Sequence, residues 1–203
     1  MATTKTIPRK PTHHKSRLET AREELETESP KLVVPVDPDR DHVQGPMTAS
    51  LTLVEYGDYQ CPYCGAAYPE IKKVQRELRS KLRFVFRNFP LTRMHEFALN
   101  AAETAEAASA QGKFWEMHDF LYEHQATLGD HSVAMNYAKN LGLDTAELER
   151  DLNRHVYQNR VKEDFDGGVR SGVNGTPTFY VNGVRHEGAA TSEELVKALQ
   201  HSK

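Results

Sequence analysis

The sequence predicts an α/β domain in which a βαβ unit and a ββα unit build one sheet, with a long helical segment between them. Three observations support this. Strand-like runs at 50–57 and 82–89 flank a helical pattern, roughly 75 residues of helical periodicity follow, and a hairpin signal with a final helix ends the chain. A chain of 203 residues can bury one core, so we expect one domain behind a tail.

Residues 1–45 have the composition of a flexible tail. They are rich in Lys, Arg, Glu, Thr and Pro, and they offer too little apolar surface to offset the entropy of ordering. Residues 16–28 combine a capping serine with good helix formers, which predicts a short helix, either solvated and fraying or docked on a partner.

The first β-containing part is expected at residues 46–91. The run at 50–57 is β-branched and aliphatic, a helical pattern covers 61–80, and a second strand is expected at 82–89, before a proline. Strand, helix and strand within about forty residues predict a βαβ unit with a right-handed crossover.

Residues 92–171 are expected to form an inserted helical subdomain. The paired glycines at 167–168 predict a break or bend near its end. The helical patterns cover 94–112, 113–125, 132–143 and 144–165.

Residues 172–203 are expected to complete the sheet. Four strand-forming residues, Thr178 to Val181, precede Asn182-Gly183, which is a strong short-range signal for a hairpin. A capped, amphipathic helix is predicted at 191–203.

Cys61 and Cys64 are the two cysteines of the chain, and their spacing allows metal binding, packing as small apolar residues, or disulfide exchange. Zinc needs further ligands at suitable spacing, whereas His118 and His124 lie more than fifty residues downstream and face different directions on a helix. We therefore expect no metal and no other cofactor. Disulfide exchange is the favoured chemistry, and the other two remain alternatives.

The position of the pair before a helix predicts two different thiols. At a helix N-terminus, unsatisfied N–H groups and the helix dipole favour the thiolate, which lowers a cysteine pKa from about 8.5 to roughly 3.5–7.5. Pro62 suits the first helical position. We expect Cys61 to be exposed and nucleophilic, and Cys64, one turn further in, to be buried and to resolve the mixed disulfide.

The motif CPYC at 61–64, Glu55 six residues before it, Pro69 five residues after it and GTPTF at 175–179 resemble one known family. It is the DsbA-like branch of the thioredoxin superfamily of thiol–disulfide oxidoreductases, and the resemblance covers about residues 46–203. It implies a thioredoxin fold with a central mixed sheet and an α-helical insertion domain.

The resemblance also implies roles for individual residues. Glu55 is expected to be buried and to relay a proton to and from Cys64. The bond before Pro177 is expected to be cis, which leaves the Thr176 backbone free to pair with an extended peptide. Apart from the resemblance, His95 follows the second strand and is expected to cap a helix or lie on the surface, with a place at the border of the site as the alternative. The residues expected to contact substrate are Pro62, Tyr63, Thr176 and Pro177.

Composition limits the partners. A formal net charge of −3 with mixed signs gives no basic face for nucleic acid. The chain lacks an apolar run of about 18–20 residues, and its first 45 residues lack a signal-peptide core, so we expect a cytoplasmic protein with no membrane insertion. The hypothesis is a monomeric reductase or isomerase that exchanges disulfides with protein or peptide thiols and needs a redox-recycling partner.

Alternatives of another class remain open. The chain could be a non-catalytic thioredoxin-like binding module, or a two-cysteine half-site for metal that dimerisation completes. Similar domains without a signal peptide occur fused to the C-termini of sodium/proton antiporters, so an accessory role beside a membrane antiporter is a further hypothesis.

Overall fold

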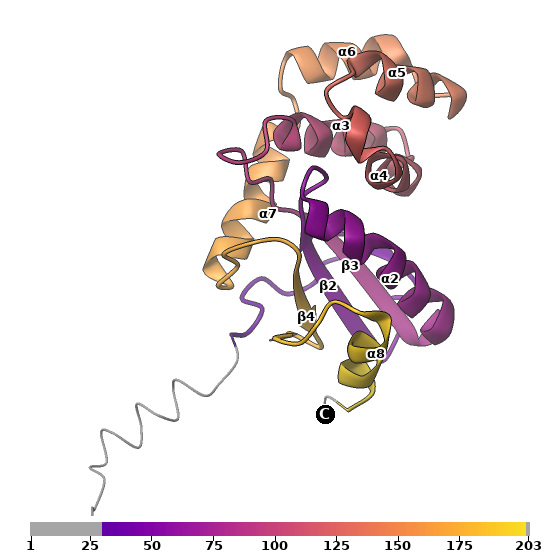
Figure 1. Ribbon diagram of the computed structural model, residues 1–203. Helices are drawn as coiled ribbons and strands as arrows, with labels where there is room; N and C mark the ends of the chain where they lie inside the picture. The colour runs from indigo at the N-terminus through magenta and orange to yellow at the C-terminus, as the bar shows by residue number, and fades with distance from the viewer. Residues whose placement is uncertain (1–29, 202–203) are drawn as a thin grey trace, which may run out of the picture.

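The computed structural model describes residues 30–201 (Figure 1). The helix predicted at 16–28 lies outside these residues. Within them, one mixed sheet has the strand order β1-β3-β2-β4-β5. The strands are β1 (His42–Gln44), β2 (Leu51–Gly57), β3 (Leu82–Asn88), β4 (Thr178–Val181) and β5 (Val184–Arg185).

The central strands form the predicted βαβ unit. β2 and β3 are parallel, with Leu53 opposite Phe84, and α2 (Pro62–Leu78) connects them. β4 runs antiparallel to β2, and the turn to β5 consists of Asn182 and Gly183, both with positive φ. The predicted α/β class, with βαβ and ββα parts on a mixed sheet, is confirmed.

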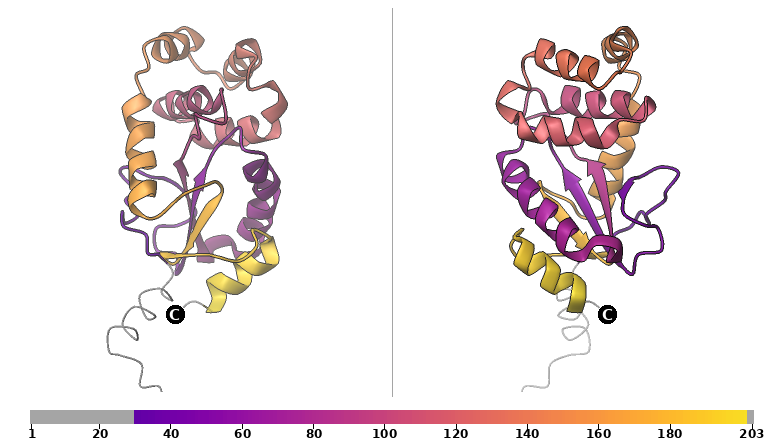
Figure 2. Two further views of the ribbon diagram at one scale, coloured as in Figure 1. Left: turned by 60° about the vertical axis from the view of Figure 1, so that its left-hand side comes forward. Right: turned by 90° about the vertical axis from the view of Figure 1, so that its right-hand side faces the viewer.

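Helices cover both faces of this sheet (Figure 2). α2 and α8 (Ser192–His201) pack side by side on one face, and α7 (Gln158–Arg170) lies on the other. Because successive side chains of a strand point to opposite faces, Leu53 and Phe86 join the core under α2, while Tyr56 joins the core under α7.

The helices between β3 and α7 lie beyond the carboxyl ends of β2 and β3, as Figures 1 and 2 show. The first of them begins later than its apolar stripe predicts, because residues 91–97 turn back towards the end of β2. No helix within residues 30–201 is both long and apolar enough to cross a bilayer. The helices are α3 (Ala98–Ala110), α4 (Phe114–Glu123), α5 (His131–Asn140) and α6 (Thr145–Asn153), with 3₁₀ turns at Arg79–Lys81 and Gln125–Thr127.

The N-terminal boundary differs from the prediction. Residues 30–45, expected to belong to the tail, pack on the domain: β1 pairs with β3, and Leu32 and Val36 contact the core under α7. A buried ion pair between Arg87 on β3 and Asp41, 2.8 Å from Nη2 to Oδ2, fixes this segment. The average composition of the tail conceals the alternating apolar residues that make this burial favourable.

The glycine pair does not break a helix, contrary to the prediction. The chain turns earlier, at 154–157, where His155 has a positive φ, and both glycines lie inside α7. A Cβ at Gly168 would stand 2.7 Å from the ring of Phe89. The glycines therefore allow α7 to approach the sheet closely, which offsets their low helix propensity.

Candidate active site

The two cysteines lie where β2 gives way to α2. Cys61 is the N-cap residue of α2 and Pro62 is its first residue, as expected, while Cys64 is fully buried one turn further on. Both are free thiols. Pro69 lies inside the same helix, at the position that the family resemblance implies.

Cys61 is buried, which corrects the prediction that it would be exposed. The residue is 3% exposed. The cause is the loop before β4, because the protonated Cys61 thiol donates to the carbonyl oxygen of Thr176 at 3.3 Å. The Thr176–Pro177 bond is cis, in agreement with the family resemblance. Tyr63, by contrast, is 75% exposed.

The environment separates the two thiols electrostatically. A hydrogen bond with the Cys64 thiol, supported by N–H groups in the first turn of α2, lowers the pKa of Cys61 to about 5 despite its burial. Burial and the same thiol contact raise the pKa of Cys64 well above its ordinary value. At neutral pH, Cys61 is therefore a thiolate and Cys64 is a protonated thiol.

Glu55 lies below this pair on β2. It is 2% exposed, and its Oε1 has no hydrogen-bond partner among the described residues. Burial, reinforced by the charge of Cys61, raises the pKa of Glu55 to about 8. Glu55 also acts electrostatically on Cys64. The structure thus brings the expected carboxyl close to both sulfurs.

Replacing Glu55 by Gln should stabilise the reduced protein by an amount that grows with pH. The folded pKa of about 8 lies above the model-compound value of 4.5, so between these pH values the fold retains a proton that the unfolded chain has released. Stability of the wild type is therefore lost as pH rises through this window, by on the order of 3–5 kcal/mol in total. Urea unfolding of both proteins at several pH values measures the difference. A difference that stays constant with pH would contradict the buried, titrating carboxyl.

Sequence reasoning missed Asp58, which organises the turn between β2 and α2. Its buried carboxylate accepts hydrogen bonds from the N–H of Gln60 at 2.8 Å and of Leu91 at 2.8 Å, and it lies 2.7 Å from His95 Nδ1. Its own N–H donates to Cys64 Sγ at 3.5 Å. The sequence offered one local signal for this role, an Asp three residues before Cys61, the N-cap residue of α2. His95 therefore ties the segment after β3 to the cysteine turn and does not cap a helix.

Gln125 was also missed, and no local pattern could have revealed it. Its Nε2 donates to the carbonyl oxygens of Tyr59 at 2.7 Å and Cys61 at 3.0 Å. Gly65 makes this approach possible, because a Cβ there would stand 2.1 Å from Gln125 Oε1. The helical insert thus holds the start of α2 directly.

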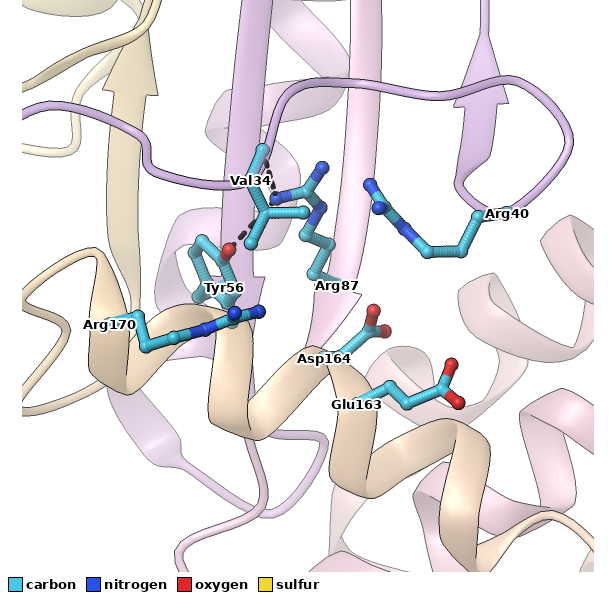
Figure 3. Close-up of a pocket in the computed structure, with 8 residues that line it drawn as sticks. Val34, Arg40, Tyr56, Arg87, Glu163, Asp164 and Arg170 are labelled. Atoms are coloured by element: carbon cyan, nitrogen blue, oxygen red, sulfur yellow. Dashed lines mark hydrogen bonds between the residues drawn. The ribbon is translucent and has the colours of Figure 1, made fainter.

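A pocket of about 180 Å³ lies on the opposite face of the sheet, beside α7 (Figure 3). Tyr56 lines it and Glu55 does not, since neighbouring residues of β2 face opposite ways. The guanidinium of Arg87 enters it but is bonded to Tyr56 OH and to the backbone of Val34 (Figure 3). The described residues contain no group of three or more His, Cys, Asp or Glu side chains that could hold a metal. The cysteine site and this pocket are separate.

The sequence comparisons identify a protein family and a set of longer relatives that contain a similar segment. A profile of the thioredoxin family matches residues 37–201. The chain is 48% identical over 168 residues to the Na⁺/H⁺ antiporter NhaA 1 of Salinispora arenicola and 43% identical over 171 residues to NhaA 1 of Mycobacterium sp. strain KMS. Each alignment covers 83% of this chain but 26% and 28% of the antiporters, so the chain spans about a quarter of the length of the curated relatives it matches.

Solved structures share the fold over nearly their whole length. Oxidised BdbD from Bacillus subtilis superposes with a TM-score of 0.73 at 24% identity, covering 85% of this chain and 96% of that chain. A thioredoxin-like oxidoreductase from Silicibacter pomeroyi gives 0.66 at 29% identity, covering 81% and 92%. α-DsbA1 from Wolbachia pipientis gives 0.70 at 18% identity, covering 83% and 92%. The helical insert belongs to the shared fold.

Proposed function

Because the chain belongs to the DsbA-like branch of the thioredoxin superfamily, we propose that it is a dithiol–disulfide oxidoreductase acting on protein or peptide thiols. The observation that carries this proposal is the asymmetry of the pair: Cys61 has a pKa of about 5, whereas the pKa of Cys64 is raised by burial. The first thiol is ready to attack and the second is protected until it is needed.

In the reducing direction, the Cys61 thiolate attacks one sulfur of a substrate disulfide. The substrate S–S bond breaks, one substrate thiolate leaves, and a mixed disulfide with Cys61 forms. Cys64 then gives its proton to the Glu55 carboxylate and attacks Cys61, which releases the second substrate thiolate and closes the Cys61–Cys64 disulfide. Oxidation of a substrate dithiol follows the same steps in reverse, and in either direction a recycling partner restores the pair.

The charge of Cys61 determines at which stage of the reaction the pKa of Glu55 falls. The Cys61 thiolate is one cause of the raised pKa of Glu55, and that charge disappears when the mixed disulfide forms. The carboxyl therefore ionises more readily at the stage when Cys64 must lose its proton. In the mixed disulfide Cys61 carries no thiol hydrogen, as in the thiolate, so the Thr176 carbonyl can accept from the backbone of an extended substrate whose side chains lie near Pro62, Tyr63 and Pro177.

The surroundings of Cys61 also influence whether the protein oxidises or reduces its substrate. Stabilising the Cys61 thiolate stabilises the dithiol form, which favours transfer of a disulfide to the substrate. In a reducing cytoplasm, the location we propose, such a pair is kept mostly reduced. It then acts as a reductase or isomerase unless an oxidising partner recharges it.

Trapping distinguishes exchange from mere binding. Cys64→Ser should leave Cys61 able to attack but without a resolving thiol, so mixed disulfides with substrate should accumulate and should disappear when a reductant is added. The measurement is nonreducing electrophoresis with mass spectrometry, together with a thiol count and metal analysis of the wild type. Two titratable thiols and no trapped species would contradict exchange, and stoichiometric zinc would favour a metal half-site instead.

A second candidate is an accessory role beside a sodium/proton antiporter. It is favoured by the identity of 48% to part of an antiporter from Salinispora arenicola. In this case the chain would work on, or dock against, a membrane protein without spanning the bilayer itself. Transport by antiporter vesicles with and without the added chain separates this role from exchange with dissolved proteins.

A further inference from the structure

We propose that Tyr122, on the helical insert, is a positioning residue for the Glu55 proton relay. Its phenolic hydroxyl donates a hydrogen bond that stabilises the Glu55 carboxylate while Glu55 takes the proton of Cys64. This inference rests on the proposed function and adds to it a residue from α4, outside the βαβ unit that carries the cysteines.

The hydroxyl of Tyr122 reaches the end of β2. Its ring is buried, stacked on Tyr68 at 5.4 Å between centroids and 4.9 Å from the ring of Tyr59. A Cβ at Gly57 would stand 2.7 Å from the Tyr122 oxygen. The absence of a side chain at Gly57 is therefore what admits the phenol to this position.

Strand geometry places this oxygen beside Glu55. Glu55 and Gly57 are two residues apart on β2 and so face the same side. The position of Phe86 agrees with this. Phe86 is the partner of Glu55 in the parallel register, and its ring would stand 2.4 Å from a Cβ at Gly57. Tyr122 and Glu55 thus occupy neighbouring sites on one face of the strand.

Both groups are buried polar groups in need of a partner. The Tyr122 hydroxyl and Glu55 Oε1 have no hydrogen-bond partner among the described residues, whereas the Tyr59 hydroxyl bonds to His118 at 3.1 Å and the Tyr68 hydroxyl to Glu123 at 3.0 Å. Leaving one such group unpaired costs about 1–3 kcal/mol. A phenol and a carboxylate are complementary donor and acceptor, so ionisation of Glu55 gives each its partner.

The surroundings keep Tyr122 protonated and therefore a donor. Burial raises its pKa well above the ordinary value, and the acidic groups that face it reinforce this. Those groups are Cys64 on α2, Glu55 on β2, and Tyr59 and Asp58 in the turn between them. On its own helix, His118 lies 5.1 Å away between ring centroids and is held neutral by burial. The phenol stabilises charge without giving up its proton.

The test is Tyr122→Phe, which removes the hydroxyl and keeps the ring. Loss of one hydrogen bond to a charged group should slow resolution of a preformed mixed disulfide by Cys64 about tenfold at neutral pH, and move the pH midpoint of that step upward by about one unit. Stopped-flow kinetics across pH measure this, and the thiolate absorbance of Cys61 against pH should not change. A ¹³C-carboxyl NMR titration of Glu55 should show the same upward shift without any turnover.

Tyr68→Phe is the matched control, because this stacked neighbour bonds to Glu123 and should leave the pH profile as in the wild type. Tyr122→Phe added to Glu55→Gln should slow resolution no further. If Tyr122→Phe had the pH profile of the wild type, or if its resolution rate fell by the same factor at every pH, the role of Tyr122 would be excluded. The proposed function would still stand as long as the wild type is active. An inactive wild type would overturn the proposed function itself.

Discussion

Cys61→Ser should abolish disulfide exchange, with a loss of at least about a thousandfold in the rate of insulin reduction. With a pKa of about 5, the wild-type Cys61 is almost fully ionised at neutral pH, whereas a serine hydroxyl remains protonated and cannot form a disulfide. Cys64 cannot substitute, because it is fully buried and its pKa is raised. The measurement is turnover with glutathione or dithiothreitol as the final reductant.

Two controls make the result specific. Cys64→Ser should retain a single round of attack, so its remaining thiol should still be alkylated, at a rate that falls as pH drops through the pKa of Cys61 in this variant. Circular dichroism should show that both variants keep the fold. Exchange by Cys61→Ser at a rate near that of the wild type would exclude Cys61 as the nucleophile.

Arg87→Met should lower the free energy of unfolding by about 3 kcal/mol, the lower end of the cost of breaking a buried ion pair, because Arg40 still pairs with Asp41 at 2.8 Å. All the N–H groups of Arg87 are used: two bond to Asp41, at 3.0 and 2.8 Å, and one each to Tyr56 OH and to the carbonyls of Val34 and Pro35. Removing the guanidinium leaves the buried Asp41 carboxylate with Arg40 and the N–H of Asp37 as its partners, and it takes one donor from each of two backbone carbonyls. Urea unfolding measures the loss, and hydrogen exchange should show early opening of residues 30–41.

Arg185→Met is the matched control. Arg185 also bonds to a backbone carbonyl, that of Gly172 at 2.7 Å, and it pairs with the exposed Glu187 at the surface, where the expected loss is within about 1 kcal/mol. Adding Asp41→Leu to Arg87→Met should recover part of the lost stability, because the buried carboxylate that has lost its buried partner is then gone. Equal losses for Arg87→Met and Arg185→Met would show that the buried pair does not fix the N-terminal segment.

Local patterns predicted most of the framework. Alternating and helical periodicities report which face of an element is apolar, and they correctly gave the two parallel strands, α2 and the hairpin at Asn182-Gly183. They failed where a short segment is buried against a distant one, as for residues 30–45. They also failed at Gly167-Gly168. A glycine pair usually indicates a helix break, but here both glycines lie inside α7, where the close packing against the sheet leaves no room for a side chain at Gly168.

The sequence by itself determined the two parallel strands, α2, the hairpin and α8, and it placed Cys61 at a helix N-terminus, where backbone N–H groups favour a thiolate in any fold. Only the tertiary structure decided the rest of the site. It covers Cys61 with Thr176, 115 residues away, and holds its carbonyl with Gln125. It also buries Glu55, which raises the pKa of that carboxyl to about 8. The physical reason is that desolvation and hydrogen bonding depend on which distant segments come into contact, and local sequence patterns do not show these contacts.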